Sequence, residues 1–402
     1  MNNKKSLRSL PRNVWVVTAT SFLTDVSSEM LSNLIPLFLA NILNTGTAVI
    51  GLIDGIAETT ASLMKIYSGW LSDKLGKRKW LTVLGYGLST IAKPFLYFAS
   101  SWHWVLGVRF TDRLGKGIRT APRDALVAGS VDEKQRGLAF GIHRAGDTAG
   151  AFLGLLIAAI IIWLTQKGSS LLQEQTFKII ILVSIIPALL AVLVLALGAR
   201  EVKAANPSQV PLLSMKGMDK RFKIFLGTVV LFTLGNSSDS FIILRGQERG
   251  LSLLQIMAML MTFNLLYAIF SGPLGALSDR IGRRKLIIAG WLTYGLVYLG
   301  FALSQTGWQV WMLFGFYGLY YAATEGTAKA LIADLVPAER RGTAYGLFNA
   351  AVGLMAFPAS AIAGLLWQGA FGWSGFGASA PFFFGASLAL LAGLLFWRFV
   401  RT

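Results

Sequence analysis

The chain of 402 residues is too apolar for a soluble globule, because 54% of its residues are hydrophobic, only 14% are charged and the mean hydropathy is +0.59. It contains no cysteine, which excludes disulfides and thiolate metal sites, and its two histidines are too few for a histidine-rich metal centre. The formal net charge of +18 would suggest nucleic-acid binding in a soluble protein. In a chain this apolar we expect it to mark one side of a membrane.

Apolar runs of about 20 residues, the length that crosses a bilayer as a helix, follow one another along the chain. Twelve such runs are predicted, at 14–40, 48–71, 80–99, 103–122, 138–164, 177–198, 222–245, 252–277, 286–304, 309–333, 343–368 and 379–399. The sequence therefore predicts an all-α integral membrane protein with twelve transmembrane helices.

Lysine and arginine are concentrated in alternate connections between these runs. The segments 1–12, 69–79, 199–221 and 275–285 are basic, whereas connections on the other side, such as 41–48, carry almost no basic residues. Positive loops stay in the cytoplasm, so this pattern places both termini on the cytoplasmic side of the cell (inner) membrane.

The basic loop GWLSDKLGKRK, Gly69–Lys79, is repeated as GALSDRIGRRK, Gly275–Lys285. The repeat extends further, since DALVAGSV from Asp124 recurs as KALIADLV from Lys329, and RGLAFG from Arg136 recurs as RGTAYG from Arg341. Such repeats predict two six-helix bundles related by pseudo-twofold symmetry, at residues 1–198 and 222–402, joined by a cytoplasmic connector at 199–221.

The pattern Gly-x-Leu-x-Asp-Arg/Lys-x-Gly-Arg/Lys-Arg/Lys in both loops resembles the signature loop of the major facilitator superfamily. The stretch Arg113-Leu-Gly-Lys-Gly117 is similar to the family's fourth-helix motif, except that Lys116 stands where glutamine is common. The resemblance covers essentially the whole chain. It implies a transporter whose two bundles move to give alternating access, and not an enzyme.

In that fold the charges of the repeated loop are expected to hold the cytoplasmic side closed in one state, because an aspartate caps a helix end and accepts hydrogen bonds from basic groups. Simple solvation of loop charges is the alternative interpretation. The candidate gate residues are Gly69, Asp73, Gly76, Arg78, Asp124, Gly275, Asp279, Gly282, Arg284 and Asp334.

Ionisable residues inside the predicted spans indicate where cargo or protons bind, since each costs about 2.5–3.5 kcal/mol in a bilayer without a partner or a wet cavity. Glu325 and Lys329 are equally explained as a simple i,i+4 pair. The aromatic residues are interpreted mostly as core or interface packing. The candidate substrate-binding or proton-coupling residues are Asp25, Glu29, Glu58, Asp112, Arg113, Lys116, Arg144, Asp147, Asn236, Asp239, Glu325 and Lys329.

We therefore expect a secondary active transporter of a small polar or amphiphilic organic solute, proton-coupled, with efflux as one option for its direction. The basic residues along the fourth predicted span favour an anionic or zwitterionic solute. A proton on Asp25, Glu29 or Glu58 is expected to exchange as Arg113 and Lys116 gain or lose an anionic group.

The alternative is a passive uniporter or a divalent-cation carrier of the same fold, with carboxylates such as Asp239 as oxygen ligands. A membrane-embedded enzyme is disfavoured because the sequence has no phosphate loop or nucleophile elbow. We expect no cofactor, no bound metal and no nucleic-acid partner, and a monomer in the lipid bilayer.

Overall fold

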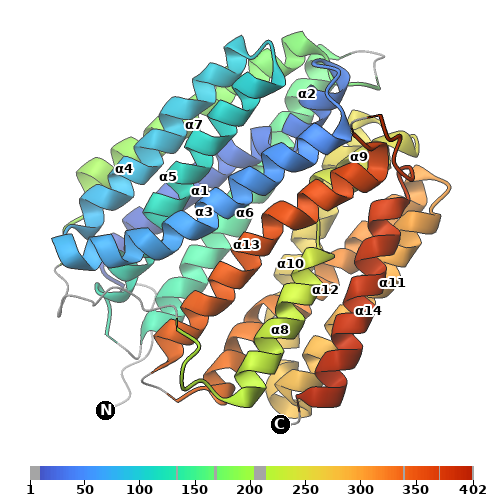
Figure 1. Cartoon of the computed structure of the whole chain (residues 1–402). Coiled ribbons are helices and arrows are strands. Elements are labelled where there is room, and N and C mark those ends of the chain that lie inside the picture. Colours follow the sequence, from blue (N-terminus) through green and yellow to red (C-terminus); the bar gives the residue numbers. More distant parts are fainter. Residues whose placement is uncertain are drawn as a thin grey trace. The chain divides into compact units, whose positions relative to one another are not determined.

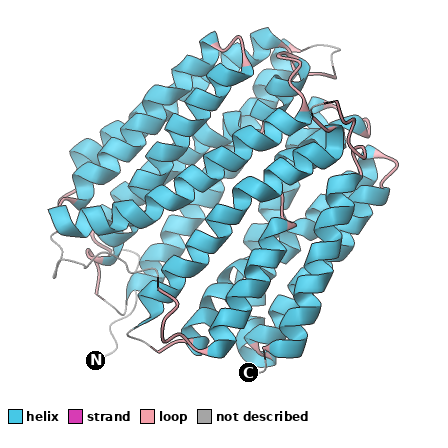
Figure 2. Ribbon diagram, in the orientation of Figure 1, coloured by secondary structure: helices cyan, strands magenta, loops and turns pink. Residues whose placement is uncertain are grey.

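The computed structural model describes residues 10–132, 135–166, 170–202, 214–337, 340–370 and 372–400. In these ranges the secondary structure is helical, without a β-strand (Figure 2). The helices are α1 (Arg12–Ser32), α2 (Ile35–Asn41), α3 (Thr47–Leu75), α4 (Arg78–Ala92), the 3₁₀ helix η2 (Lys93–Phe98), α5 (Trp102–Ala128), α6 (Arg136–Thr165), α7 (Glu174–Gly198), α8 (Lys220–Leu234), α9 (Ser240–Glu248), α10 (Leu253–Ile281), α11 (Arg283–Leu303), α12 (Gly307–Leu335), α13 (Arg341–Gln368) and α14 (Ala380–Phe399).

The all-helical prediction is confirmed, and seven helices among the described residues are long and apolar enough to cross a membrane. They are α3, α6, α7, α10, α11, α13 and α14. The other predicted spans are charged, as in α5, or interrupted, as in α8 and α9. The count of twelve spans and the side of the termini stay predictions.

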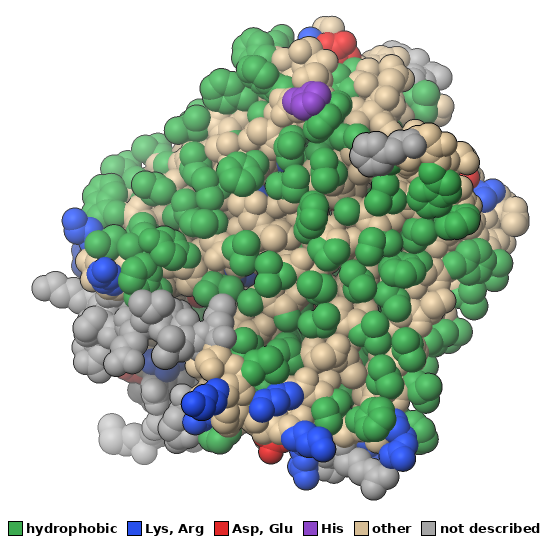
Figure 3. Space-filling view, in the orientation of Figure 1, with side chains coloured by type: hydrophobic (Ala, Val, Ile, Leu, Met, Phe, Trp, Pro, Cys, Tyr) green, Lys and Arg blue, Asp and Glu red, His purple; other side chains and the backbone are tan. Residues whose placement is uncertain are grey.

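Large hydrophobic side chains are exposed on these helices, among them Phe98, Trp163 and Leu197 at 67%, 66% and 73% exposure. The face drawn in Figure 3 is likewise mostly hydrophobic. Exposing so much continuous apolar surface to water would be energetically unfavourable, so this surface faces lipid. The protein is embedded in a membrane.

Contacts divide the chain into two units. The first unit comprises Met1–Leu34, Thr60–Ile161 and Gln175–Pro211, and the second comprises Ile35–Thr59, Ile162–Glu174 and Leu212–Thr402. The second unit thus takes in Ile35–Thr59, which precede the predicted connector. Residues 1–198 and 222–402 as duplicated halves stay a prediction.

In the first unit α5 packs along α4 and η2, and also contacts α1 (Figure 1). Its core includes Val14, Val17, Tyr86, Leu126 and Leu195. This packing buries Arg109, Arg113 and Arg119 of α5 inside the unit, whereas Lys116 is exposed.

In the second unit α12 packs against α10 and α11, α14 packs against α8 and α11, and the short helices α2 and α9 touch (Figure 1). Its core is aromatic. Phe232 stacks on Trp291 at 4.8 Å between ring centroids, and Tyr294 stacks on Tyr298 at 4.1 Å. Offset and edge-to-face ring pairs of this kind add to the stabilisation from burial alone.

Candidate functional site

A basic cluster lies inside the first unit, formed by Lys93 of η2 and by Arg109, Arg113 and Arg119 of α5. All four side chains are buried, at 5% to 9% exposure. The i,i+4 spacing of Arg109 and Arg113 places them on one helical face, and Asp112 feels the charge of all four basic residues. Arg113 Nε lies 4.0 Å from Asp112 Oδ2.

Lys93 was not among the predicted site residues. Its ammonium donates to Ser27 Oγ at 2.6 Å and to Ser28 Oγ at 3.1 Å. Both serines belong to α1, so the lysine ties η2 to the first helix. The one signal in the sequence was a lone lysine inside the third predicted apolar run.

Arg119 lies in the same neighbourhood and is held in a similar way. Its Nη1 donates to Ser89 Oγ at 3.0 Å, and its guanidinium lies 4.3 Å from the centre of the Tyr86 ring. Ser89 in turn donates to the carbonyl of Asp112 at 2.9 Å. A cation over an aromatic face is stabilised by the ring quadrupole.

Carboxylates form a second group beside this cluster. The charged neighbours of Asp25 are Asp147, Glu29, Arg119 and Lys116. Glu29 accepts from Asn33 Nδ2 at 2.8 Å. Three other predicted residues, Glu29, Lys116 and Asp147, thus lie within electrostatic reach of Asp25.

Asp147 belongs to α6, and its Oδ1 lies 3.8 Å from His143 Nδ1 of the same helix. Arg144 is exposed. Glu58 belongs to the second unit, so the structure groups it apart from Asp25 and Glu29.

In the second unit, polar side chains gather where α8 ends and α9 begins. Tyr317 Oη donates to Asp239 Oδ1 at 2.8 Å and approaches Asn236 Oδ1 at 3.5 Å. Tyr294 Oη donates to the carbonyl of Gly235 at 3.0 Å. The break in the helix exposes backbone carbonyls, which buried phenols satisfy.

This tyrosine group was not predicted. Tyr294, Tyr298 and Tyr317 are fully buried, and Tyr321 meets Tyr317 edge to face at 5.1 Å. A tyrosine in an apolar helix is usually a packing residue, so no pattern in the sequence indicated that the hydroxyls of Tyr294 and Tyr317 reach Asn236 and Asp239.

Two further carboxylates of the second unit have defined partners. Asp54, which is 4% exposed, accepts from Ser238 Oγ at 2.8 Å. Glu325 accepts from Tyr267 Oη at 2.5 Å and lies 3.8 Å from Lys329 Nζ. The i,i+4 pair is therefore present, and a phenol from α10 joins it.

The predicted gate residues lie at the helix ends around the repeated loops. Arg78 donates to the carbonyl of Ala125 at 3.4 Å, and Asp124 pairs with Arg123 at 2.8 Å. Gly69 lies within α3, and Gly76 follows that helix with φ +61°. Asp73 lies within α3, and its side chain is outside the described part of the structure.

In the second repeat, Arg283 and not Arg284 makes the ion pairs. Arg283 Nη1 lies 2.5 Å from Asp334 Oδ1, and its Nη2 lies 3.4 Å from Asp279 Oδ1. Arg284 donates to the carbonyl of Trp397 instead. Gly275 lies within α10, and Gly282 follows it with φ +97°.

Arg245 of α9 was also absent from the predicted site, and its contacts show a structural role. The side chain is fully buried and donates to the carbonyls of Phe301 and Ala302 and to Ser379 Oγ, at 3.0–3.1 Å. It also pairs with Glu248 at 2.7 Å. It therefore fastens α9 to the ends of α11 and α14.

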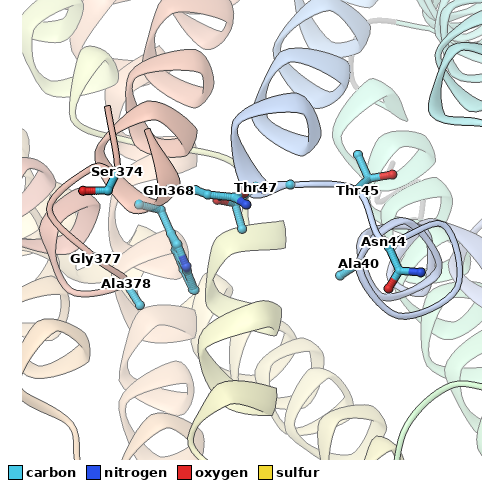
Figure 4. Close-up of a pocket in the computed structure, with 10 residues that line it drawn as sticks. Ala40, Asn44, Thr45, Thr47, Gln368, Ser374, Gly377 and Ala378 are labelled. Carbon is cyan, nitrogen blue, oxygen red and sulfur yellow. Dashed lines mark hydrogen bonds between the residues drawn. The ribbon is translucent and has the colours of Figure 1, made fainter. Parts of the chain in front are cut away.

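The second unit has a surface hollow of about 520 Å³, drawn in Figure 4. Its lining includes Asn44, Thr47, Gln368 and Ser374 and contains no charged side chain among the described residues. Gln368 Oε1 accepts from the Thr47 amide at 2.5 Å. The predicted site residues lie elsewhere.

No three carboxylate or histidine side chains come together as a metal-binding group in the described residues. Asp25, Glu29 and Asp239 therefore do not form a preassembled divalent-cation cage there.

Sequence comparison decides the family. The family described as Major Facilitator Superfamily matches residues 17–244 and 224–402. The chain belongs to the major facilitator superfamily.

Among superfamily relatives, the chain is 36% identical over 399 residues to an uncharacterized MFS-type transporter of Methanocaldococcus jannaschii, covering 98% of this chain and 96% of the relative. It is 26% identical to a probable 4-methylmuconolactone transporter of Cupriavidus pinatubonensis, covering 73% and 70%. It is 22% identical to the multidrug resistance protein MdtG of Enterobacter lignolyticus, covering 75% and 73%.

Solved structures show the same superfamily fold. The nucleoside transporter NupG matches with a TM-score of 0.80 at 13% identity, covering 97% of this chain and 100% of that one. The D-xylose-proton symporter matches with a TM-score of 0.76 at 16% identity, covering 97% and 98%. The family match and the relative from Methanocaldococcus jannaschii make the chain a transporter of the MFS type.

Proposed function

We propose that this protein is a secondary active transporter that moves a small polar or amphiphilic organic solute, anionic or zwitterionic, across the cell membrane by alternating access. It has twelve spans in two six-helix bundles, 1–198 and 222–402, with both termini in the cytoplasm. A proton gradient drives it. It works as a monomer without a cofactor.

One observation carries the proposal. A mixed set of buried charges, with Lys93, Arg113 and Arg119 near Asp25 and Asp112, lies inside helices that pack in a membrane protein. Burying these charges inside a membrane protein is energetically costly, and a bundle that did not bind a charged solute would not require them. A solute that carries charge makes use of it.

The relatives support an organic cargo. Their names include a probable 4-methylmuconolactone transporter and multidrug resistance proteins. The D-xylose-proton symporter among the solved neighbours supports proton coupling. Asp25 is the carboxylate that we expect to carry the coupled proton, because it lies among the acidic neighbours Glu29 and Asp147 and the basic neighbours Lys116 and Arg119, so its charge responds to both signs.

The test is transport by the purified protein in liposomes, with benzoate, glutamate, glycine betaine and choline as probes and with an imposed pH gradient. We expect pH-driven flux of an anion or zwitterion, abolished in Asp25→Asn and retained in Glu201→Gln, a change in an exposed loop carboxylate. Flux of choline alone would overturn the assignment of charge.

The alternative is a passive uniporter or a divalent-cation carrier. Flux of the same probes that ignores the pH gradient would favour the uniporter. Manganese uptake that is lost in Asp25→Asn would favour the cation carrier, although the described carboxylates do not converge on a metal site.

A further inference from the structure

Lys93 and Arg119 are two buried cations that the first unit holds with hydroxyl groups. Lys93 donates to Ser27 and Ser28, and Arg119 donates to Ser89. Within the described residues neither side chain forms an ion pair with a carboxylate. They nevertheless lie close enough for each charge to act on the other.

The acids nearby are already engaged. Asp112 sits beside Arg113, its neighbour in sequence, and Asp25 faces the carboxylates of Asp147 and Glu29. Asp112 and Asp25 act on Lys93 from a distance, but the hydrogen-bond partners of both cations in the described residues are neutral hydroxyls. Such burial is costly, because hydroxyls do not repay the lost hydration of an ammonium or a guanidinium.

We propose that Lys93 and Arg119, with the hydroxyls of Ser27, Ser28 and Ser89, form a binding site for an oxyanion group, a carboxylate or a phosphate, of the transported solute. This site deepens the proposed function and rests on it. A lysine contributes a compact charge and an arginine contributes a planar fork of donors, and the two together suit an oxyanion.

The serines suit both states of the site. A hydroxyl accepts from the ammonium when the site is empty, and it rotates to donate to an oxyanion when the site is filled. Ser27 and Ser28 also connect Lys93 to α1, the helix that carries Asp25 and Glu29. Binding of the anion is thereby linked to the helix with the predicted proton carrier.

A purely structural role of Lys93 and a binding role of Lys93 predict opposite effects of Lys93→Met on the melting temperature. If Lys93 served only to fasten η2 to α1, Lys93→Met would lower the melting temperature of the ligand-free protein. If Lys93 is a binding group, Lys93→Met raises the melting temperature, because a well-packed apolar side chain of similar length replaces a buried charge that forms no ion pair in the described residues.

The experiment is thermal unfolding of the purified full-length protein in detergent, with sodium benzoate or sodium phosphate against sodium chloride at equal ionic strength. The variants are Lys93→Met, Lys93→Gln and Lys93→Arg, and the control is Lys223→Gln, because Lys223 is an exposed residue of α8 outside the candidate site. Benzoate reports a carboxylate and phosphate reports a phosphoryl group.

We expect at least one oxyanion to raise the melting temperature of the wild type and of Lys223→Gln. Lys93→Gln and Lys93→Met should weaken the apparent affinity at least about tenfold, and Lys93→Arg should keep part of the response. No oxyanion response in the wild type, or an equal one in Lys93→Met, would overturn the proposal.

The two proposals fail separately. Oxyanion stabilisation that depends on Lys93 without any flux in liposomes would leave the site standing and refute transport. Flux of an organic solute that is indifferent to Lys93→Gln would leave transport standing and refute the site.

Discussion

Arg283 and Asp334 form a tight ion pair between the start of α11 and the end of α12, with Nη1 2.5 Å from Oδ1. The same guanidinium donates to the carbonyl of Ala330 at 2.7 Å. In the other repeat, Arg78 donates to the carbonyl of Ala125 at 3.4 Å. The first arginine of each helix after the repeated loop thus holds the end of the neighbouring helix.

Replacing Arg283 by glutamine should loosen the last turn of α12. An exposed pair of this kind contributes about 0.5–1 kcal/mol, so amide hydrogen exchange over Ala330–Leu335 should become roughly two- to fivefold faster. Arg284→Gln is the matched control, because Arg284 bonds to α14 and not to α12. Equal acceleration in both variants would contradict this role for Arg283.

The arginine that makes this contact occupies a different position in each copy of the repeated loop. Aligned letter by letter, Arg78 matches Arg284, but α4 begins at Arg78 and α11 begins at Arg283. Lys77 precedes the first helix, whereas Gly282 itself precedes the second. The two loops are equal in length, so α11 begins one residue earlier in the aligned sequence than α4, and a comparison of side-chain types does not show where each helix begins.

The helices were predictable because lipid imposes long apolar runs, although the runs 14–40, 80–99 and 222–245 are each divided between two helices in the described residues. The charged site was only partly predictable. Asp112, Arg113 and Lys116 stand out on α5 because they interrupt apolar sequence. Lys93 is a single charge near a helix end and is typical of an interfacial residue, and Tyr317 is typical of a core residue, since only the tertiary fold brings its hydroxyl to Asp239.

Gly282 has a backbone conformation that other residues rarely adopt, with φ +97° and ψ 132°. No atom of the described residues lies within 4 Å of the position that an alanine Cβ would take there, so Gly282→Ala costs backbone strain alone, about 1–3 kcal/mol. Gly87→Ala, inside α4 and equally uncrowded, should be neutral or stabilise by about 0.5–1 kcal/mol. In thermal unfolding, Gly282→Ala should therefore lower the melting temperature. Gly87→Ala should leave the melting temperature unchanged or raise it. Similar shifts would argue against strain at Gly282.

Arg245→Met should be among the most destabilising single changes in the second unit. It removes donors to the carbonyls of Phe301, Ala302 and Ser304 and to Ser379 Oγ, and it leaves Glu248 without its closest partner. Loss of one member of a buried charged network costs about 3–5 kcal/mol.

The control for that change is Arg249→Met, because Arg249 also reaches Glu248, at 3.8 Å, but is partly exposed. It should cost less than about 1 kcal/mol. Thermal unfolding measures both. A larger effect at Arg249 than at Arg245 would refute the fastening role.

Tyr317 and Asp239 should be coupled energetically through their 2.8 Å hydrogen bond. Tyr317→Phe removes the donor and should destabilise the protein by about 1.5–3 kcal/mol, as expected for a bond to a charged acceptor. Tyr345→Phe is the control, since its hydroxyl donates to the carbonyl of Lys329 at an exposed position, and it should cost less than Tyr317→Phe.

A double-mutant cycle with Asp239→Asn isolates the Tyr317–Asp239 term. The two substitutions should be non-additive by about 0.5–3 kcal/mol in thermal or denaturant unfolding, because each alone already breaks or weakens the same bond. The pair Tyr345→Phe with Asp239→Asn should be additive, since no described contact joins them. Additivity of Tyr317→Phe with Asp239→Asn would show that the bond contributes nothing to the break between α8 and α9, and that the tyrosine group is held by ring packing alone.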